Sequence, residues 1–167
     1  MGQKEDLFLH LEAATPALRR YARALCVCMG AAAADDLVQT AIDRVAARLR
    51  ARELRHAEAA RVAAYQLLTA LAREKLSGHP EAVVPPRRST LVRGLADLPF
   101  EERAALLLVV LEGLSYEATA HVILAPREAV VMRLMRARAA LAPLDLHPSS
   151  APHDGVRRGG AHLRVVK

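Results

Sequence analysis

The spacing of apolar residues in residues 114–141 predicts two short helices joined by a turn, and this pattern constrains the fold more than any other. Ser115 is a good N-cap for the first helix, and Glu117 places negative charge in its first turn. Pro126 suits the first position of the second helix, because its missing N–H would have no partner there. Apolar residues then recur at helical spacing, at Val130, Leu134, Ala137 and Leu141.

The same spacing leaves arginine side chains on the outer face of the second helix. A basic outer face on the second helix of such a pair is what contact with DNA phosphates requires. The pattern therefore favours a helix-turn-helix, although two ordinary amphipathic helices with a solvated charged face would show the same spacing.

Together with the stretch before it, this segment resembles region four of the extracytoplasmic-function sigma factors, the bacterial subunits that direct RNA polymerase to promoters. The resemblance runs without a gap from Leu95 to Leu141. It rests on Asp97-Leu98-Pro99, Glu101-Glu102-Arg103, Leu114-Ser115-Tyr116-Glu117, Pro126, Val130 and Arg136-Ala137-Arg138. The DNA-binding candidates that it implies are Arg127, Glu128, Val131, Arg133, Arg136 and Arg138.

Residues 18–50 form a second block, which resembles region two of the same family. A helix is followed by another that begins near Asp35 and Asp36, where negative charge favours the helix dipole. In the family this second helix docks on the clamp helices of the largest polymerase subunit. The residues that the resemblance places toward that partner are Asp35, Asp36, Gln39 and Arg44. Taken alone, the acidic pair would be interpreted as a helix cap. Because this block and the region four-like block occur in the same order as in the family, we favour the resemblance.

The chain as a whole is expected to be all-α, with two small helical domains joined by a proline-rich linker. The abundance of Ala, Leu and Arg, with little alternation of period two, supports helices over strands. A third helical pattern over residues 57–76 completes the first domain. The expected organisation is a region two-like domain at 1–76, a linker at 77–90, a region four-like domain at 91–142 and a disordered basic tail at 143–167.

Single-stranded DNA would have to be held near the end of the second helix of the first domain. The candidates there are Arg48, Arg50, Arg52 and Arg55. They could follow a strand's phosphates, but residues 48–58 contain no aromatic side chain on which a base could stack. A solvated basic helix end would look the same.

Charge and cysteine content limit the function classes. A net charge of +6 and a pI near 10.0 imply attraction to a polyanion without identifying it. Cys26 and Cys28 lie too close together for the usual zinc pairs, so we expect reduced structural thiols, with a redox switch as the alternative. No metal, cofactor or small-molecule substrate is expected, and the chain lacks the glycine loop, HExxH or nucleophile elbow of common enzymes.

No stretch is apolar enough to cross a bilayer, since the longest apolar run, residues 104–111, is far below the ~20 residues required. We therefore expect a cytoplasmic protein with no membrane contact. Its expected partners are core RNA polymerase, promoter DNA and an anti-sigma factor.

Two hypotheses on function remain. The main one is an extracytoplasmic-function sigma factor that binds core polymerase and directs promoter recognition. The second helix departs from the family pattern, because Leu124 stands at the usual turn glycine, and Glu128, Ala129 and Met132 stand where the family tends to have small or polar residues that approach DNA. The other hypothesis is motivated by the apolar residues of this helix. An apolar stripe of Val131, Met132 and Met135 could be a protein contact, unless it is buried against the preceding helices. The alternative is a sigma-like module that sequesters an anti-sigma factor or polymerase without opening promoters.

Overall fold

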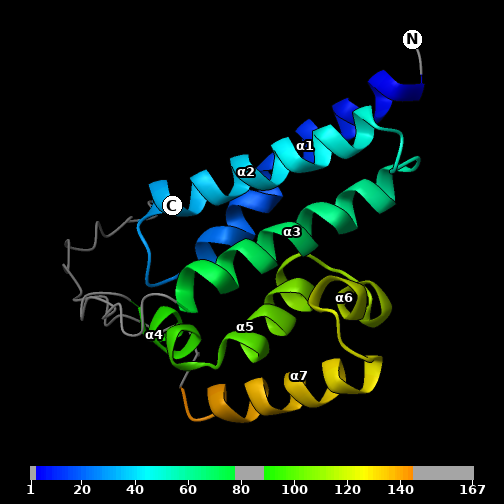
Figure 1. Cartoon of the computed structure of the whole chain (residues 1–167). Coiled ribbons are helices and arrows are strands. Elements are labelled where there is room, and N and C mark those ends of the chain that lie inside the picture. The colour runs from blue at the N-terminus through cyan, green and yellow to red at the C-terminus, as the bar shows by residue number, and fades with distance from the viewer. Residues whose placement is uncertain (1–2, 78–88, 145–167) are drawn as a thin grey trace, which may run out of the picture.

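The computed structural model describes residues 3–77 and 89–144, and within these ranges the chain is helical without a β-strand (Figure 1). The predicted all-α fold is confirmed. The tail predicted for 143–167 and the linker predicted for 77–90 lie almost entirely outside the described residues.

Three long helices, α1 (Gln3–Leu25), α2 (Ala31–Arg50) and α3 (Ala57–Ser77), pack against one another. Helix α2 turns a stripe of buried residues toward the other two because apolar side chains recur every three or four positions. The stripe consists of Ala34, Val38, Ala41, Val45, Ala46 and Leu49. Tyr21 and Tyr65 join α1 to α3 as an edge-to-face pair with ring centroids 5.4 Å apart.

The second half is built from shorter helices. These are α4 (Thr90–Asp97), α5 (Phe100–Leu106), the π-helical turn η1 (Leu107–Leu111), α6 (Tyr116–Ile123) and α7 (Arg127–Leu141). The Ser89 hydroxyl caps α4 by accepting a hydrogen bond from the Val92 N–H at 3.4 Å. Buried Arg103 of α5 donates to the carbonyl oxygens of Leu95 and Ala96, both at 3.2 Å, and so satisfies the C-terminal end of α4.

Two helix starts differ slightly from the sequence expectation. Helix α2 begins at Ala31 after an extended Gly30, so Asp35 and Asp36 lie in its second turn and neither caps it. The helix begins before the acidic pair because residues 31–34 are four alanines, which have high helix propensity. Pro126 is the N-cap of α7 in extended conformation, and Arg127 is the first helical residue.

The two halves share one continuous hydrophobic core. Figure 1 shows α5 and α6 lying between α3 and α7, with α7 on the far side of them from α2. Helix α3 packs on α6, while α1 contacts α5 and η1. The second half is therefore held in a fixed position on the first.

Candidate functional site

The turn between α6 and α7 is a tight one that depends on a left-handed residue. Ser115 caps α6 as predicted, accepting a hydrogen bond from the Ala118 N–H at 3.1 Å. Leu124 ends the helix with φ of 52°, and the following Ala125 N–H donates to the Ala120 carbonyl at 3.0 Å. A leucine in this conformation is strained where a glycine would not be, and its side chain is 74% exposed.

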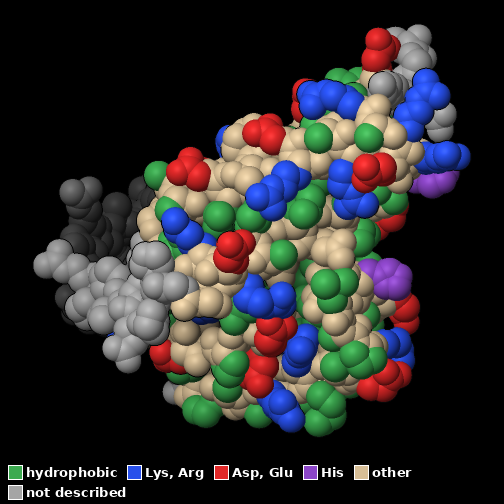
Figure 2. Space-filling view, viewed as in Figure 1, with side chains coloured by type: hydrophobic (Ala, Val, Ile, Leu, Met, Phe, Trp, Pro, Cys, Tyr) green, Lys and Arg blue, Asp and Glu red, His purple; other side chains and the backbone are tan. Residues whose placement is uncertain are grey.

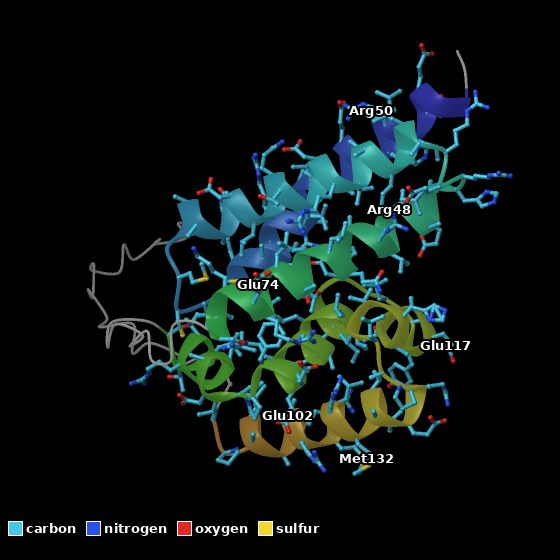
Figure 3. All side chains as sticks on the ribbon, in the orientation of Figure 1. Arg48, Arg50, Glu74, Glu102, Glu117 and Met132 are labelled. Atoms are coloured by element: carbon cyan, nitrogen blue, oxygen red, sulfur yellow. The ribbon has the colours of Figure 1, made fainter. Side chains whose placement is uncertain are left out.

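Helix α7 packs on the domain through the predicted inward residues, since Val130, Leu134 and Ala137 are buried. Its outer face is apolar at its centre, because Met132 is 48% exposed and Met135 is 60% exposed. Figure 3 shows Met132 pointing away from the rest of the molecule. The two methionines, three positions apart, therefore share an exposed face that the preceding helices do not cover.

The predicted DNA-binding residues of α7 are not equivalent in the structure. Arg127 forms an ion pair with Glu117 at 2.8 Å and lies over the Tyr116 ring. Arg133, only 24% exposed, lies 3.3 Å from the Glu101 carboxylate of α5, a charge contact without hydrogen-bond geometry.

The other predicted DNA-binding residues of α7 have no ion pair within the described part of the chain. Arg136, Arg138 and Glu128 are exposed, and Val131 is half-buried. Only two of the four predicted arginines, Arg136 and Arg138, are therefore fully available to an outside partner.

The residues expected to face polymerase lie on α2. Asp36, Gln39 and Arg44 are exposed, whereas Asp35 is half-buried and held by two hydrogen bonds from Arg23, at 2.6 and 3.0 Å. The hydrogen bonds from Arg23 lower the pKa of Asp35 below its ordinary value. Gln39 donates to the Asp43 carboxylate at 3.0 Å, which adds an exposed acid that the sequence interpretation did not include.

The residues proposed for single-stranded DNA are divided between a helix and a loop. Arg48 and Arg50 belong to the last turn of α2, and Arg52 follows it with φ of 61°. The Arg50 guanidinium lies 5.6 Å from the centre of the Phe8 ring, so the fold supplies an aromatic neighbour from α1 that residues 48–58 lack. Arg48 is paired with Glu53 at 3.1 Å, and Arg55 is exposed. Figure 3 shows Arg48 and Arg50 across the molecule from Met132.

A buried carboxylate joins the two halves. Glu112, whose side chain is 1% exposed, follows η1 and accepts two hydrogen bonds from Arg20 of α1, at 3.0 and 3.1 Å. It accepts a third from the Tyr65 hydroxyl of α3 at 2.7 Å. Burial and the bond to Glu112 both raise the pKa of Tyr65, so this hydroxyl remains a donor. The sequence interpretation placed Tyr65 in the core and did not predict that these three residues meet.

The two cysteines are free thiols. Cys26 is buried beside Arg103, and burial raises its pKa to about 11, although the nearby guanidinium opposes the shift. A neutral, enclosed thiol fits the predicted structural role better than a redox role.

Charges on the face shown in Figure 2 are mixed, with Lys and Arg side chains interspersed among Asp and Glu. This face presents no single basic field of the kind that wraps DNA phosphates. Among the described residues no helix is both long and apolar enough to span a bilayer. The same residues contain no cluster of three or more His, Cys, Asp or Glu arranged to hold a metal ion.

The α4–α7 segment, with its capped short helix, left-handed turn and final helix α7, matches a known family model. Residues 88–141 match sigma-70, region 4. The predicted resemblance to region four is confirmed over this region 4 segment, which supports a helix-turn-helix of the DNA-binding type. A comparison with curated protein sequences finds no match.

Solved structures similar to most of this chain include a sigma factor and an anti-anti-sigma factor, each in complex with an anti-sigma factor. The PhyRSL–NepR complex from Sphingomonas sp. Fr1 has a TM-score of 0.64 and 23% identity, over 98% of this chain and 99% of that one. The sigma factor RpoE in complex with the anti-sigma factor NepR, from Bartonella quintana, has a TM-score of 0.53 and 24% identity, over 85% and 97%.

A third similar structure is the anti-anti-sigma factor PhyR complexed with the anti-sigma factor NepR, also from Bartonella quintana. It has a TM-score of 0.59 and 18% identity, over 81% of this chain. This chain spans about half of that PhyR, since 49% of it is covered. At these identities the likenesses establish a sigma-like fold, with the region 4 segment packed on a three-helix half.

Proposed function

We propose that this chain is a sigma-like interaction module that binds an anti-sigma factor and is not itself a promoter-directing sigma factor. In this proposal it is a binding protein without catalytic activity. It acts by occupying an anti-sigma factor that would otherwise hold a sigma factor.

The outer face of α7 carries the proposal. Base edges in the major groove are recognised chiefly by Arg, Lys, Asn and Gln side chains. The centre of this face instead exposes Met132 and Met135, with acidic Glu128 one turn before Met132 and Arg136 one turn after it. Methionine side chains adapt to varied apolar partners, and an exposed apolar stripe usually marks a protein contact. The face is therefore better suited to a protein partner with apolar side chains than to DNA base edges.

The arrangement of the two halves also supports a protein partner. Because Glu112 is held from α1 and α3 at once, the region 4 segment is fixed on the first half. A partner that contacts both halves would meet a preformed surface and would lose less conformational entropy on binding. An anti-sigma factor is the partner class favoured by the similar structures, because NepR is bound in each of the three described above.

An active sigma factor remains the second candidate. It is favoured by the match of the region 4 segment and by the exposure of Asp36, Gln39 and Arg44 on α2. This candidate requires binding to core RNA polymerase and initiation at a promoter.

The proposal is tested by isothermal titration calorimetry with purified Sphingomonas NepR. Wild-type chain is compared with a Met132→Ser/Met135→Ser variant and with Leu9→Ser, a control that removes a 50% exposed leucine from α1. We expect wild type and the control to bind NepR and the double variant to bind about tenfold or more weakly. Absence of binding by wild type, together with co-elution with core polymerase and promoter-dependent initiation, would establish the second candidate instead.

A further inference from the structure

The structure has a second surface, on the side of α1, where basic and apolar side chains meet. Pro16, Arg19, Arg20 and Arg23 recur at helical spacing and line a shallow hollow. Arg20 of this stripe is bonded to Glu112, the residue that follows Leu111 at the end of η1. The arginine stripe and the end of η1 therefore lie side by side.

The π-helical turn that ends beside Arg20 carries two exposed apolar side chains. The Glu112 N–H bonds back to the Leu107 carbonyl at 3.1 Å, so the turn contains an extra residue relative to an α-helix. Leu107 and Leu108 are buried, but Val110 is 65% exposed and Leu111 is 37% exposed. Such turns inside helices occur frequently at functional sites.

The arginines of the stripe are preorganised to receive acidic groups. Arg20 and Arg23 each use Nε and Nη2 to hold Glu112 and Asp35, which fixes the plane of each guanidinium. Within the described residues their Nη1 groups make no hydrogen bond, and both side chains are about half exposed, at 54% and 51%. Arg19 is exposed and forms no ion pair among the described residues. Its charge interacts with Asp35 only at longer range.

We infer that this α1–η1 surface is a second docking surface for the anti-sigma partner and that it takes a segment with acidic side chains beside apolar ones. The inference rests on the proposed function. The apolar side chains of that segment pack on Val110 and Leu111, and its carboxylates accept hydrogen bonds from Arg19 and from the free edges of Arg20 and Arg23. Together with the methionine face of α7, this surface lets one partner hold both halves.

The test uses Sphingomonas NepR and the full chain carrying Arg19→Glu or Val110→Ser. Neither residue has a partner that the fold needs, and thermal unfolding followed by circular dichroism verifies that each variant is folded. Arg93→Glu is the matched control, because it makes the same charge change at an exposed α4 residue outside the surface. We expect Arg19→Glu and Val110→Ser each to raise the Kd about tenfold, and Arg93→Glu to leave it within about twofold.

Salt dependence provides a second readout. We expect the Kd of wild type to rise with salt and that of Arg19→Glu to rise less steeply, because a charge contact has been lost. Wild-type affinity in both surface variants, with weakened binding by Met132→Ser/Met135→Ser, would overturn this inference and leave the proposed function standing. If wild type does not bind NepR, the proposed function fails and this inference fails with it.

Discussion

The guanidinium of Arg20 donates two hydrogen bonds to the carboxylate of Glu112, 92 positions later in the chain, and this contact links the first helix to the region 4 segment. Tyr65 completes the contact from α3. The Glu112 side chain is only 1% exposed, so hydrogen bonds from Arg20 and Tyr65 stabilise its charge where water cannot.

Removing the Tyr65 hydroxyl tests this contact without introducing a new charge. We expect Tyr65→Phe to lower the free energy of unfolding by about 1.5–3 kcal/mol, the range for a hydrogen bond to a charged group. Urea denaturation measures the change. Tyr116→Phe removes a hydroxyl that makes no hydrogen bond within the described residues and should have little effect. Equal stability of the two variants would show that Tyr65 does not hold Glu112.

The strained turn between α6 and α7 predicts a stabilising substitution. Leu124 has φ of 52° and an exposed side chain, so Leu124→Gly relieves strain and loses little packing. We expect the free energy of unfolding to rise by up to about 1 kcal/mol, because the relief is partly offset by the greater freedom of glycine in the unfolded chain.

The control for this substitution is Ala47→Gly, on an exposed position inside α2. It should lower the free energy of unfolding by about 1 kcal/mol. A thermal melt in which both glycine variants are destabilised would contradict the assignment of a left-handed Leu124.

The pair of Asp35 and Arg23 predicts a dependence of stability on pH. Arg23 lowers the pKa of Asp35 in the folded chain below the ordinary value of 3.8, so the unfolded chain takes up the proton first. The contribution of this pair to stability is complete above that value and is lost as the pH falls through the lowered pKa.

Wild type should therefore lose stability more steeply than Asp35→Asn between about pH 4 and pH 2. Urea denaturation across this range measures it. Asp36→Asn serves as the control, since the Asp36 side chain is exposed and accepts no hydrogen bond within the described residues. Parallel curves for wild type and Asp35→Asn would rule out a contribution from this pair.

We expect two arginines of α7, Arg136 and Arg133, to contribute differently to weak binding of duplex DNA. Arg136→Ala is expected to reduce the slope of log K against log salt concentration by about one, as the loss of one phosphate contact does. Arg133→Ala should leave the slope unchanged, because its half-buried side chain lies against Glu101. Fluorescence anisotropy over a series of salt concentrations measures both slopes. An equal decrease for the two variants would place Arg133 on the DNA-facing side.

Local patterns predicted the helices well, but they did not predict which side chains meet. The spacing of Val130, Leu134 and Ala137 predicted the inward face of α7. Ser115 predicted the start of α6. Both predictions succeed because they depend only on residues a few positions apart in the sequence. Met132 and Met135 could not be assigned to core or surface from spacing, since α7 has apolar residues on more than one side. Their exposure follows from where α5 and α6 lie.

The contacts between the halves could not be predicted from the sequence. Arg20 and Glu112 each look like solvated surface charges in their own helices, and only the packing of η1 on α1 makes one the partner of the other. Glu101 likewise restrains Arg133 only because α5 lies beside α7. Identifying such pairs requires the tertiary arrangement.

If this chain occupies an anti-sigma factor, it should compete with a sigma factor for that partner. Labelled Bartonella quintana RpoE is bound to NepR of the same species, the chain is added in increasing amounts, and release of RpoE is followed by fluorescence anisotropy. We expect wild type to displace RpoE, and Met132→Ser/Met135→Ser to need about tenfold or more protein to do so. If wild type leaves RpoE bound and instead supports promoter-dependent initiation by core RNA polymerase, the chain is a sigma factor and the proposed function is wrong.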